Sequence, residues 1–301
     1  MMLAAERPAG VGFPWAAPPP LRQAGALGLM RRVAKEAVLA AALARADGFI
    51  ASYPKSGRTW LRFILANYLN RLLELGLTID LRTMFWLIPN DVLDRERGSP
   101  AYRFRHARRV PFLVMSHGLW RRSLFQRKPV VLLVREPKDT LVSLYFHLTR
   151  HSRAFAGDLK AFIADPQHGA PAFSHYCNRW ADGLRHHPHL VLAYEQLRRA
   201  PEEAVADLLR VFALPVEPAA LAAAVAASSL DAMGAVERQG GIPGHRYDPG
   251  ERDSRRVRRG EIGGFRAHLD EADVACVERI CASRLSEPAK RLLAGAGLVH
   301  G

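Results

Sequence analysis

The sequence predicts one α/β domain in which helices flank a central parallel sheet. Four short apolar runs, at residues 49–53, 111–116, 130–134 and 189–194, have the length and composition of strands. Segments with apolar residues at helical spacing separate these runs, and such alternation is typical of a doubly wound sheet. With 301 residues, of which 49% are hydrophobic, the chain is long enough to bury a large core.

The expected elements follow one another in a regular order. We expect residues 1–28, which are rich in Pro and Ala, to form a flexible arm, and residues 29–301 to form the domain. The stretch 33–46 contains three charged residues and therefore predicts a helix, not a membrane span. Apolar spacing predicts a second helix over 59–75, and an amphipathic pattern predicts another over 201–212.

Polar or aromatic residues follow each of the four predicted strands. Lys55 and Ser56 come after the first strand, His117 after the second, Arg135 after the third and Tyr194 at the end of the fourth. In an open parallel sheet the carboxyl ends of the strands share one edge, and ligands bind outside that edge. The sequence therefore predicts that these side chains meet at one site.

The composition indicates an anionic partner and a reducing compartment. The net charge is +14 and the pI about 10.4, and only six of the 43 basic residues are lysines. An excess of cations favours a nucleotide, a nucleic acid, a membrane face or an acidic glycan as partner. Three cysteines without a CxxC pattern argue against both a disulfide framework and a zinc site, so we expect a cytoplasmic protein: Cys177, Cys276 and Cys281.

The stretch "SYPKSGRTW" at 52–60 resembles a phosphate-binding P-loop with its order inverted. A P-loop places its lysine after the last glycine, whereas Lys55 precedes Gly57 here. A tight loop that leads into a helix directs backbone N–H groups and the positive helix end at one point. Ser56 and Thr59 add hydroxyl donors. We interpret the stretch as a site for a terminal phosphate-like anion, the alternative being an ordinary turn that contains Pro and Gly.

The second informative stretch is "REPKDTLVSLYFH" at 135–147. A nucleotide kinase places a magnesium-binding aspartate after the corresponding buried strand, but this chain has Arg135. Arg135 and Ser143, eight residues later on a predicted helix, suit a second anion. The alternative is that Arg135 pairs with a carboxylate such as Asp139.

Together these stretches resemble the sulfotransferases that use 3′-phosphoadenosine 5′-phosphosulfate (PAPS). That family carries Y-P-K-S-G-[TR]-T-W after its first strand, matched by residues 53–60. It carries R-x-P-x-D-x-x-x-S in mid-chain, matched from Arg135 to Ser143, and R-K-G-x-x-G-x-[WF] near the C-terminus, matched by "RRGEIGGF" at 258–265. Three motifs in this order make the resemblance specific, and it implies an α/β sulfotransferase with PAPS as co-substrate.

The resemblance also implies roles for individual residues. The 5′-phosphosulfate is held by the first loop, namely Lys55, Ser56, Gly57, Arg58 and Thr59. The adenine and nucleoside are contacted by Trp60, Tyr194 and Ser228, and the 3′-phosphate by Arg135, Ser143, Arg258, Arg259 and Gly260. The catalytic residues are Lys55, His117 as the base, and Ser143, which steers Lys55 between its resting and working positions.

Four positions depart from the family's pattern. Met115 stands where many cytosolic members have a lysine, so a second active-site cation is missing or supplied by an arginine. Arg58 replaces a threonine and adds charge to the loop, Leu230 replaces a phenylalanine beside the adenine, and Gly264 replaces an aspartate. These differences leave the acceptor open among a phenol, an alcohol, a sugar and a lipid-linked glycan.

Two other functions fit part of the sequence. A P-loop kinase fits the position of the first loop but not its lysine or the missing aspartate. A basic nucleic-acid-binding protein fits the arginine content, including "RRVRRG" at 255–260, but no basic-aromatic recognition module is present. We therefore expect no nucleic acid partner, no metal and no membrane span.

The remaining motifs have simpler interpretations. The histidines of "RHHPH" at 185–189 and the pair His147 and His151 are interpreted as solvated, not as metal ligands. Residues 240–264 hold seven glycines and two prolines, which predicts an irregular, mobile segment. We expect this segment to close over the nucleotide and to bind its 3′-phosphate together with Arg135.

Overall fold

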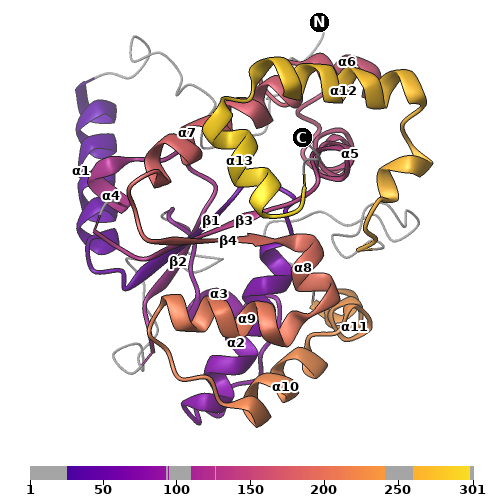
Figure 1. Ribbon diagram of the computed structural model, residues 1–301. Coiled ribbons are helices and arrows are strands. Elements are labelled where there is room, and N and C mark those ends of the chain that lie inside the picture. The colour runs from indigo at the N-terminus through magenta and orange to yellow at the C-terminus, as the bar shows by residue number, and fades with distance from the viewer. Residues whose placement is uncertain (1–25, 93, 95–109, 126, 241–259, 299–301) are drawn as a thin grey trace, which may run out of the picture.

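The computed structural model describes residues 26–92, 94, 110–125, 127–240 and 260–298. The sheet consists of β1 (Gly48–Ser52), β2 (Leu113–Ser116), β3 (Val130–Val134) and β4 (His189–Ala193). All pairings are parallel and the strand order is β2-β1-β3-β4. Helices cover both faces of the sheet, which confirms the predicted α/β fold (Figure 1).

The helices of the described ranges alternate with the strands along the chain. Those before β4 are α1 (Ala26–Leu43), α2 (Arg58–Leu72), α3 (Met84–Leu87), α4 (Arg122–Phe125), α5 (Pro137–Phe146), α6 (Leu159–Ala164) and α7 (Ala170–Leu184). Those after β4 are α8 (Tyr194–Arg199), α9 (Pro201–Val211), α10 (Pro218–Ala227), α11 (Leu230–Gly240), α12 (Glu271–Arg284) and α13 (Glu287–Gly295). A π-helix, η3 (His147–His151), continues α5, and a 3-10 helix, η5 (Gly264–Ala267), precedes α12.

The predicted boundaries need small corrections. The run at 111–116 enters the sheet only at Leu113, because Pro111 has no N–H to donate and Phe112 N–H donates to Asp47 Oδ2 at 2.6 Å instead. Tyr194 does not end β4 but begins α8. The helix α1 begins at Ala26, inside the predicted arm, and the rest of that arm lies outside the described residues.

The helix α9 follows the prediction closely. Pro201 occupies its first turn, where the missing N–H costs nothing, and Glu202 and Glu203 lie beside the positive helix end. The pair His147 and His151 lies in the π-helix η3, at its first and last residues.

The strands end together at one edge of the sheet. Ala51 of β1 pairs with Ser116 of β2, and Val134 of β3 pairs with Ala193 of β4. After β1 the chain forms β2 on one side and then crosses to form β3 on the other side of β1. In such a sheet the crevice at the carboxyl ends of β1 and β3 is the topological switch point, where ligands bind.

Alternate residues of each strand are buried on opposite faces of the sheet. Phe49 and Leu132 lie in a cluster with residues of α5, α7, α12 and α13. Ile50 and Val131 lie in a second cluster with residues of α2, α3, α9 and α10, below the sheet in Figure 1. All strand residues of β1, β2 and β3 are buried, as expected of central parallel strands covered on both faces.

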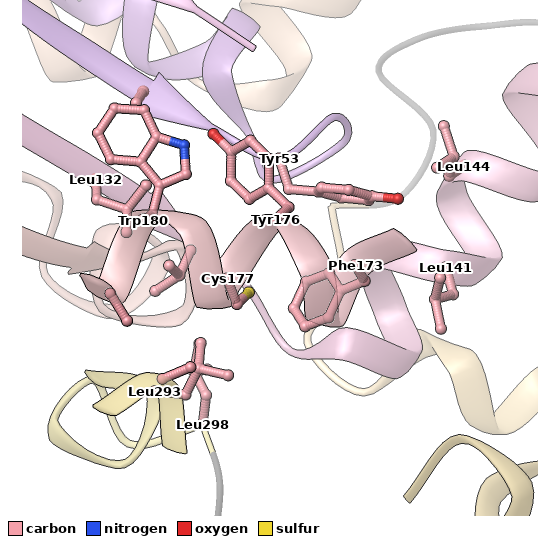
Figure 2. Packing of buried hydrophobic residues seen from close by; sticks show 14 of the residues in the cluster. Tyr53, Leu132, Leu141, Leu144, Phe173, Tyr176, Cys177, Trp180, Leu293 and Leu298 are labelled. Atoms are coloured by element: carbon pink, nitrogen blue, oxygen red, sulfur yellow. The ribbon is translucent and has the colours of Figure 1, made fainter. Parts of the chain in front are cut away.

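The aromatic side chain that follows β1 anchors the next loop to α7 (Figure 2). The ring of Tyr53 contacts those of Phe173 and Tyr176 edge-on, with centroids 5.2 and 5.3 Å away. Its hydroxyl donates to the carbonyl of His168 at 3.1 Å. Tyr53 is 2% exposed, and burial raises the pKa of its hydroxyl. The start of the predicted phosphate loop is therefore held in the core and positioned by packing.

In the described part of the chain no single helix has the length and apolar character needed to cross a bilayer. The helix α10 and residues Leu230–Arg238 of α11 meet that test only when taken together, and they are bent by 53° relative to each other. Within this pair, Leu221 and Ala224 of α10 are buried in the cluster that contains α2.

Candidate active site

The loop between β1 and α2 has the backbone form of an anion site. Lys55 has φ of 70° and Gly57 has φ of 94°, so the chain turns sharply before α2 begins at Arg58. Ser56 is fully buried, and its Oγ has no hydrogen-bond partner among the described residues. A buried hydroxyl without a partner costs about 1–3 kcal/mol. Ser56 therefore supports a bound anion at this loop.

Gly57 also makes room for a neighbouring side chain. A Cβ added at this position would lie 2.4 Å from Cδ2 of Tyr194 and would require the left-handed backbone that glycine tolerates. Because the ring lies against the loop, Tyr194 helps to hold the loop in its turn.

We expect Gly57→Ala to lower the free energy of unfolding by more than Gly76→Ala. Both glycines have positive φ, which costs an L-residue about 1–2 kcal/mol, but nothing lies within 4 Å of a Cβ at Gly76. The excess loss at Gly57 measures the collision with Tyr194, and urea denaturation of both variants provides the comparison. Equal losses would show that the ring moves away freely.

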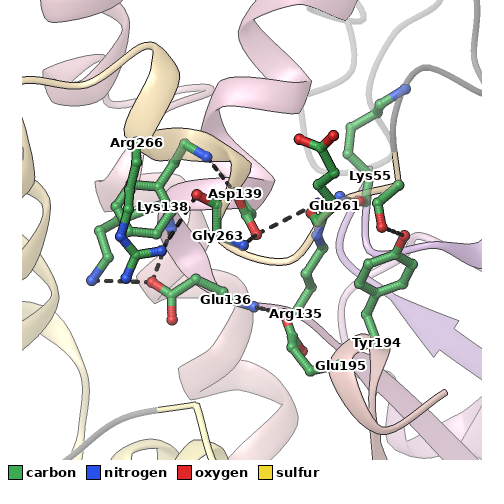
Figure 3. Close-up of polar contacts among 12 residues, drawn as sticks. Lys55, Arg135, Glu136, Lys138, Asp139, Tyr194, Glu195, Glu261, Gly263 and Arg266 are labelled. Atoms are coloured by element: carbon green, nitrogen blue, oxygen red, sulfur yellow. Dashed lines mark hydrogen bonds and ion pairs between the residues drawn. The ribbon is translucent and has the colours of Figure 1, made fainter. Parts of the chain in front are cut away.

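Arg135 lies at the switch point and contacts both the loop after β1 and the C-terminal motif (Figure 3). Its Nη1 donates to the carbonyl of Lys55 at 3.2 Å and its Nη2 to the carbonyl of Glu261 at 3.3 Å. Its guanidinium also lies 4.4 Å from the ring centroid of Tyr194. The buried Nε has no partner among the described residues. The cation thus lies between the loop after β1 and the C-terminal motif.

The alternative pairing of Arg135 with Asp139 is present but long. Nη2 of Arg135 lies 3.6 Å from Oδ2 of Asp139, whereas the carboxylate accepts two backbone N–H groups, from Gly263 and Phe265, each at 2.8 Å. Asp139 therefore mainly attaches the C-terminal motif to the first turn of α5. The pairing leaves Arg135 beside both loops and does not remove it from the site.

Gly260 brings the C-terminal motif against Tyr194 and α11. Its carbonyl accepts the Tyr194 hydroxyl at 3.0 Å, and its φ is 60°. A Cβ at this position would lie 2.7 Å from Cδ1 of Leu230. A side chain here would displace Leu230 and would require the left-handed backbone that glycine tolerates. Arg258 and Arg259, predicted for the 3′-phosphate, lie outside the described residues, as does most of the segment 240–264.

Trp60 and Ser228 lie side by side. Trp60 is 8% exposed, and its Nε1 donates to the carbonyl of Ser228 at 2.7 Å. The hydroxyl of Ser228 accepts from Asn67 Nδ2 at 3.2 Å. Arg198 lies over the Trp60 ring, 5.3 Å from its centroid. The structure brings these two predicted nucleoside contacts together, and their role stays a prediction.

The histidine at the end of β2 has a defined tautomer. His117 Nδ1 lies 2.7 Å from the carbonyl oxygen of Ser52, at the end of the adjacent strand β1. Since a carbonyl only accepts, Nδ1 carries the hydrogen, and the neutral ring has its lone pair at Nε2. The ring is half-buried, and its role as a base stays a prediction. Met115, where the family often has a lysine, is buried in the core.

Sequence reasoning missed Asp91, which contacts Ser116, the residue before His117. Ser116 Oγ donates to Asp91 Oδ2 at 2.5 Å and accepts the Gly118 N–H at 2.8 Å. Burial raises the pKa of the Asp91 carboxyl, and the Ser116 hydrogen bond and the charges of Arg58 and Arg121 partly offset this. No strand or motif signal marked this position, because Asp91 is placed by the backbone pairing of its segment with Met115.

The charge of Arg58 acts on the His117 side of the loop. Besides Asp91, its charge lowers the pKa of Tyr176, although burial raises that pKa more strongly. That Arg58 adds charge to the phosphate loop, and the role of that charge, stay predictions.

Glu195 was also missed. It is buried next to Tyr194, and its Oε1 accepts the Glu136 N–H at 3.1 Å, which fixes the start of α5 beside Arg135 (Figure 3). Burial raises the pKa of its carboxyl. Ser143 lies on α5, half-buried, and Thr59 lies in the first turn of α2. The proposed steering of Lys55 by Ser143 stays a prediction.

Among the described residues, no group of three or more His, Cys, Asp or Glu side chains could hold a metal ion. The tract at 185–189 lies in the turn before β4 and at its first residue, where His187 packs against Trp120 with centroids 5.4 Å apart.

Comparison with known proteins decides the family of this chain. Residues 45–289 match the sulfotransferase domain family. The chain belongs to that family. This sulfotransferase-family chain is 25% identical over 170 residues to Sulfotransferase 6B1 of Danio rerio. That alignment covers 54% of each protein, so the chain spans about half the length of this curated relative.

Solved structures share the fold of this family member at low sequence identity. Mouse sulfotransferase SULT7A1, solved in complex with PAP, has a TM-score of 0.58 and 16% identity, over 87% of this chain and 94% of the mouse chain. Retinol dehydratase, solved with retinol and PAP, has a TM-score of 0.57 and 18% identity, over 80% and 81% of the two chains. The likeness extends over most of each chain and supports the assigned fold.

Proposed function

We propose that this protein transfers a sulfuryl group from PAPS to a hydroxyl or amine acceptor. The observation that carries the proposal is the position of Arg135, whose guanidinium donates to the carbonyls of Lys55 and Glu261 at the β1/β3 switch point. This arrangement joins an anion-binding loop to a glycine-rich C-terminal motif beside one cation. Family membership gives the reaction class.

The reaction proposed is an in-line displacement at sulfur. The acceptor oxygen or nitrogen gives its proton to Nε2 of His117 and forms a bond to sulfur, while the bond from sulfur to the 5′-phosphate oxygen breaks. The leaving group is 3′,5′-bisphosphoadenosine (PAP), which takes the electron pair. Lys55, Ser56 and the N–H groups of the loop stabilise the charge that grows on the leaving oxygen, where preorganised donors contribute most.

The solved relatives support a small hydroxylated acceptor. Retinol dehydratase has been solved with retinol and with androsterone, each together with PAP. Both compounds are alcohols with a large apolar body. For this chain we propose an acceptor hydroxyl or amine that lies beside His117.

A thermal-shift comparison of PAP, ATP and short DNA tests the proposed function. A ligand at 100 times its Kd stabilises the native state by about 2.7 kcal/mol, so PAP is expected to raise the Tm by several degrees. Neither ATP nor DNA should match this shift. A larger shift with ATP and magnesium would indicate a kinase, and a salt-dependent shift with DNA alone would indicate a nucleic-acid-binding protein.

Transfer should persist in excess EDTA. The described site uses Arg135, Lys55 and backbone donors, and no cluster of carboxylates or histidines within the described ranges could hold a metal. The measurement is sulfuryl transfer from PAPS with and without chelator. Loss of activity that magnesium restores would contradict the proposed mechanism.

A further inference from the structure

The helix α1 exposes apolar side chains to a degree that the rest of the described surface does not. The three most exposed large hydrophobic side chains in the described ranges all lie on it: Met30 at 69%, Val33 at 57% and Val38 at 53%. At its C-terminal end Leu43 is buried and Leu39 half-buried in the core cluster. Figure 1 shows α1 at the edge of the molecule. Because Leu39 and Leu43 lie in its last turns, the helix is attached to the core there.

The exposed face of α1 is apolar along most of the helix. In an α-helix, residues three or four apart share a face. Met30, Val33, Ala37 and Ala41 follow this spacing and are all exposed. Leu39 and Leu43, four apart, form a different face, the one that packs on the core. The exposed apolar side chains are thus a continuous stripe opposite the attached side.

The charges around the stripe are mostly positive. Arg31 and Lys35, four residues apart, are exposed along one side of it. Further exposed cations lie at this end of the molecule, on the segment after α1 and in and around α4: Arg45, Arg121, Arg122 and Arg127. The exposed acidic residues of α1 and the segment after it are Glu36 and Asp47. An apolar stripe bordered by cations is complementary to an anionic lipid surface.

A second copy of the chain would fit this face less well. Two such helices packed stripe to stripe would bring the cations of Arg31 and Lys35 of both copies together. The stripe also offers little area, because Ala37 and Ala41 contribute only a methyl group each, whereas a stable interface buries about 1,200–2,000 Å². A bilayer needs no matching protein surface, and the attraction of cations to anionic lipids adds to the burial of a small apolar stripe.

We propose that α1 binds parallel to an anionic membrane surface. Met30, Val33 and Ala37 enter the boundary between headgroups and acyl chains, and Arg31 and Lys35 contact the anionic headgroups with their stems along the apolar layer. The helix lies on the bilayer and does not cross it. This surface is separate from the candidate active site and does not depend on the proposed reaction.

The test is co-sedimentation of the full chain with phospholipid vesicles. Binding is expected to vesicles that contain phosphatidylserine and not to phosphatidylcholine alone, and it should weaken as salt is added. The double variant Val33→Glu, Ala37→Glu should lose binding. Arg31→Gln and Lys35→Gln should each weaken it by about fivefold.

The matched control carries the same two added charges on α12, as Ala272→Glu, Ala275→Glu, where both alanines are exposed. It should bind vesicles as the wild type does, or slightly more weakly because two added carboxylates lower the net positive charge. Circular dichroism and the Tm in the presence of PAP report whether each variant is folded.

Four outcomes would overturn the proposal. In the first, the wild type fails to bind anionic vesicles. In the second, the α1 and α12 variants lose binding equally. In the third, sedimentation velocity would find a dimer that the α1 variant abolishes, and the face would belong to a second copy. Vesicle binding that requires deletion of residues 1–25 would likewise reject the proposal for the full chain.

Discussion

His117→Ala is expected to lower kcat by about 10²- to 10⁴-fold, the usual contribution of a positioned general base. The reason lies in the geometry at the end of β2. Nδ1 donates to the carbonyl of Ser52 at 2.7 Å, so the ring is oriented and its basic nitrogen is Nε2. PAP affinity should change little, because the proposed nucleotide contacts come from other strand ends.

The matched control is His175→Ala, which removes an exposed histidine from α7. Steady-state kinetics give kcat, and calorimetric titration with PAP gives the affinity of each variant. A folded His117→Ala protein with near-normal turnover would remove His117 from the mechanism. Loss of PAP binding together with turnover would instead show that the ring supports the fold of the site.

Arg135→Ala is expected to weaken PAP binding by about 10- to 150-fold, which corresponds to one charge-assisted hydrogen bond of about 1.5–3 kcal/mol. Arg135 lies at the switch point with Nε buried and unpartnered among the described residues, so a bound anion would complete its hydrogen bonding. Its carbonyl contacts with Lys55 and Glu261 would be lost in the same variant.

A pair of ligands separates these two effects. Adenosine 5′-phosphosulfate lacks the 3′-phosphate, so its affinity should fall less than that of PAP if Arg135 binds that phosphate. Calorimetric titration of both ligands into wild type, Arg135→Ala and the control Arg291→Ala, which removes an exposed arginine of α13, gives the comparison. An equal loss for both ligands would mean that Arg135 only clamps the two loops together.

Much of this structure was predictable from local sequence patterns. The four strands lie within two residues of the apolar runs that predicted them, because a central parallel strand must be apolar on both faces. The sharp turn after β1 was predicted from Pro, Gly and the following helix. Its position at the same edge of the sheet as His117 and Arg135 followed from the parallel order of the strands. The three motifs also indicated the family that the comparison then confirmed.

Contacts between distant segments were decided only by the tertiary structure. Asp91 reaches Ser116 through a pairing at the edge of β2, and Glu195 reaches the start of α5 from the end of β4. Neither has a periodic or motif signal, because a buried carboxylate is positioned by partners far away in the chain. The outward direction of the apolar stripe on α1 was likewise decided by the tertiary structure. Hydrophobic spacing determines that a helix has an apolar face, but packing of Leu39 and Leu43 on the core determines which way that face points.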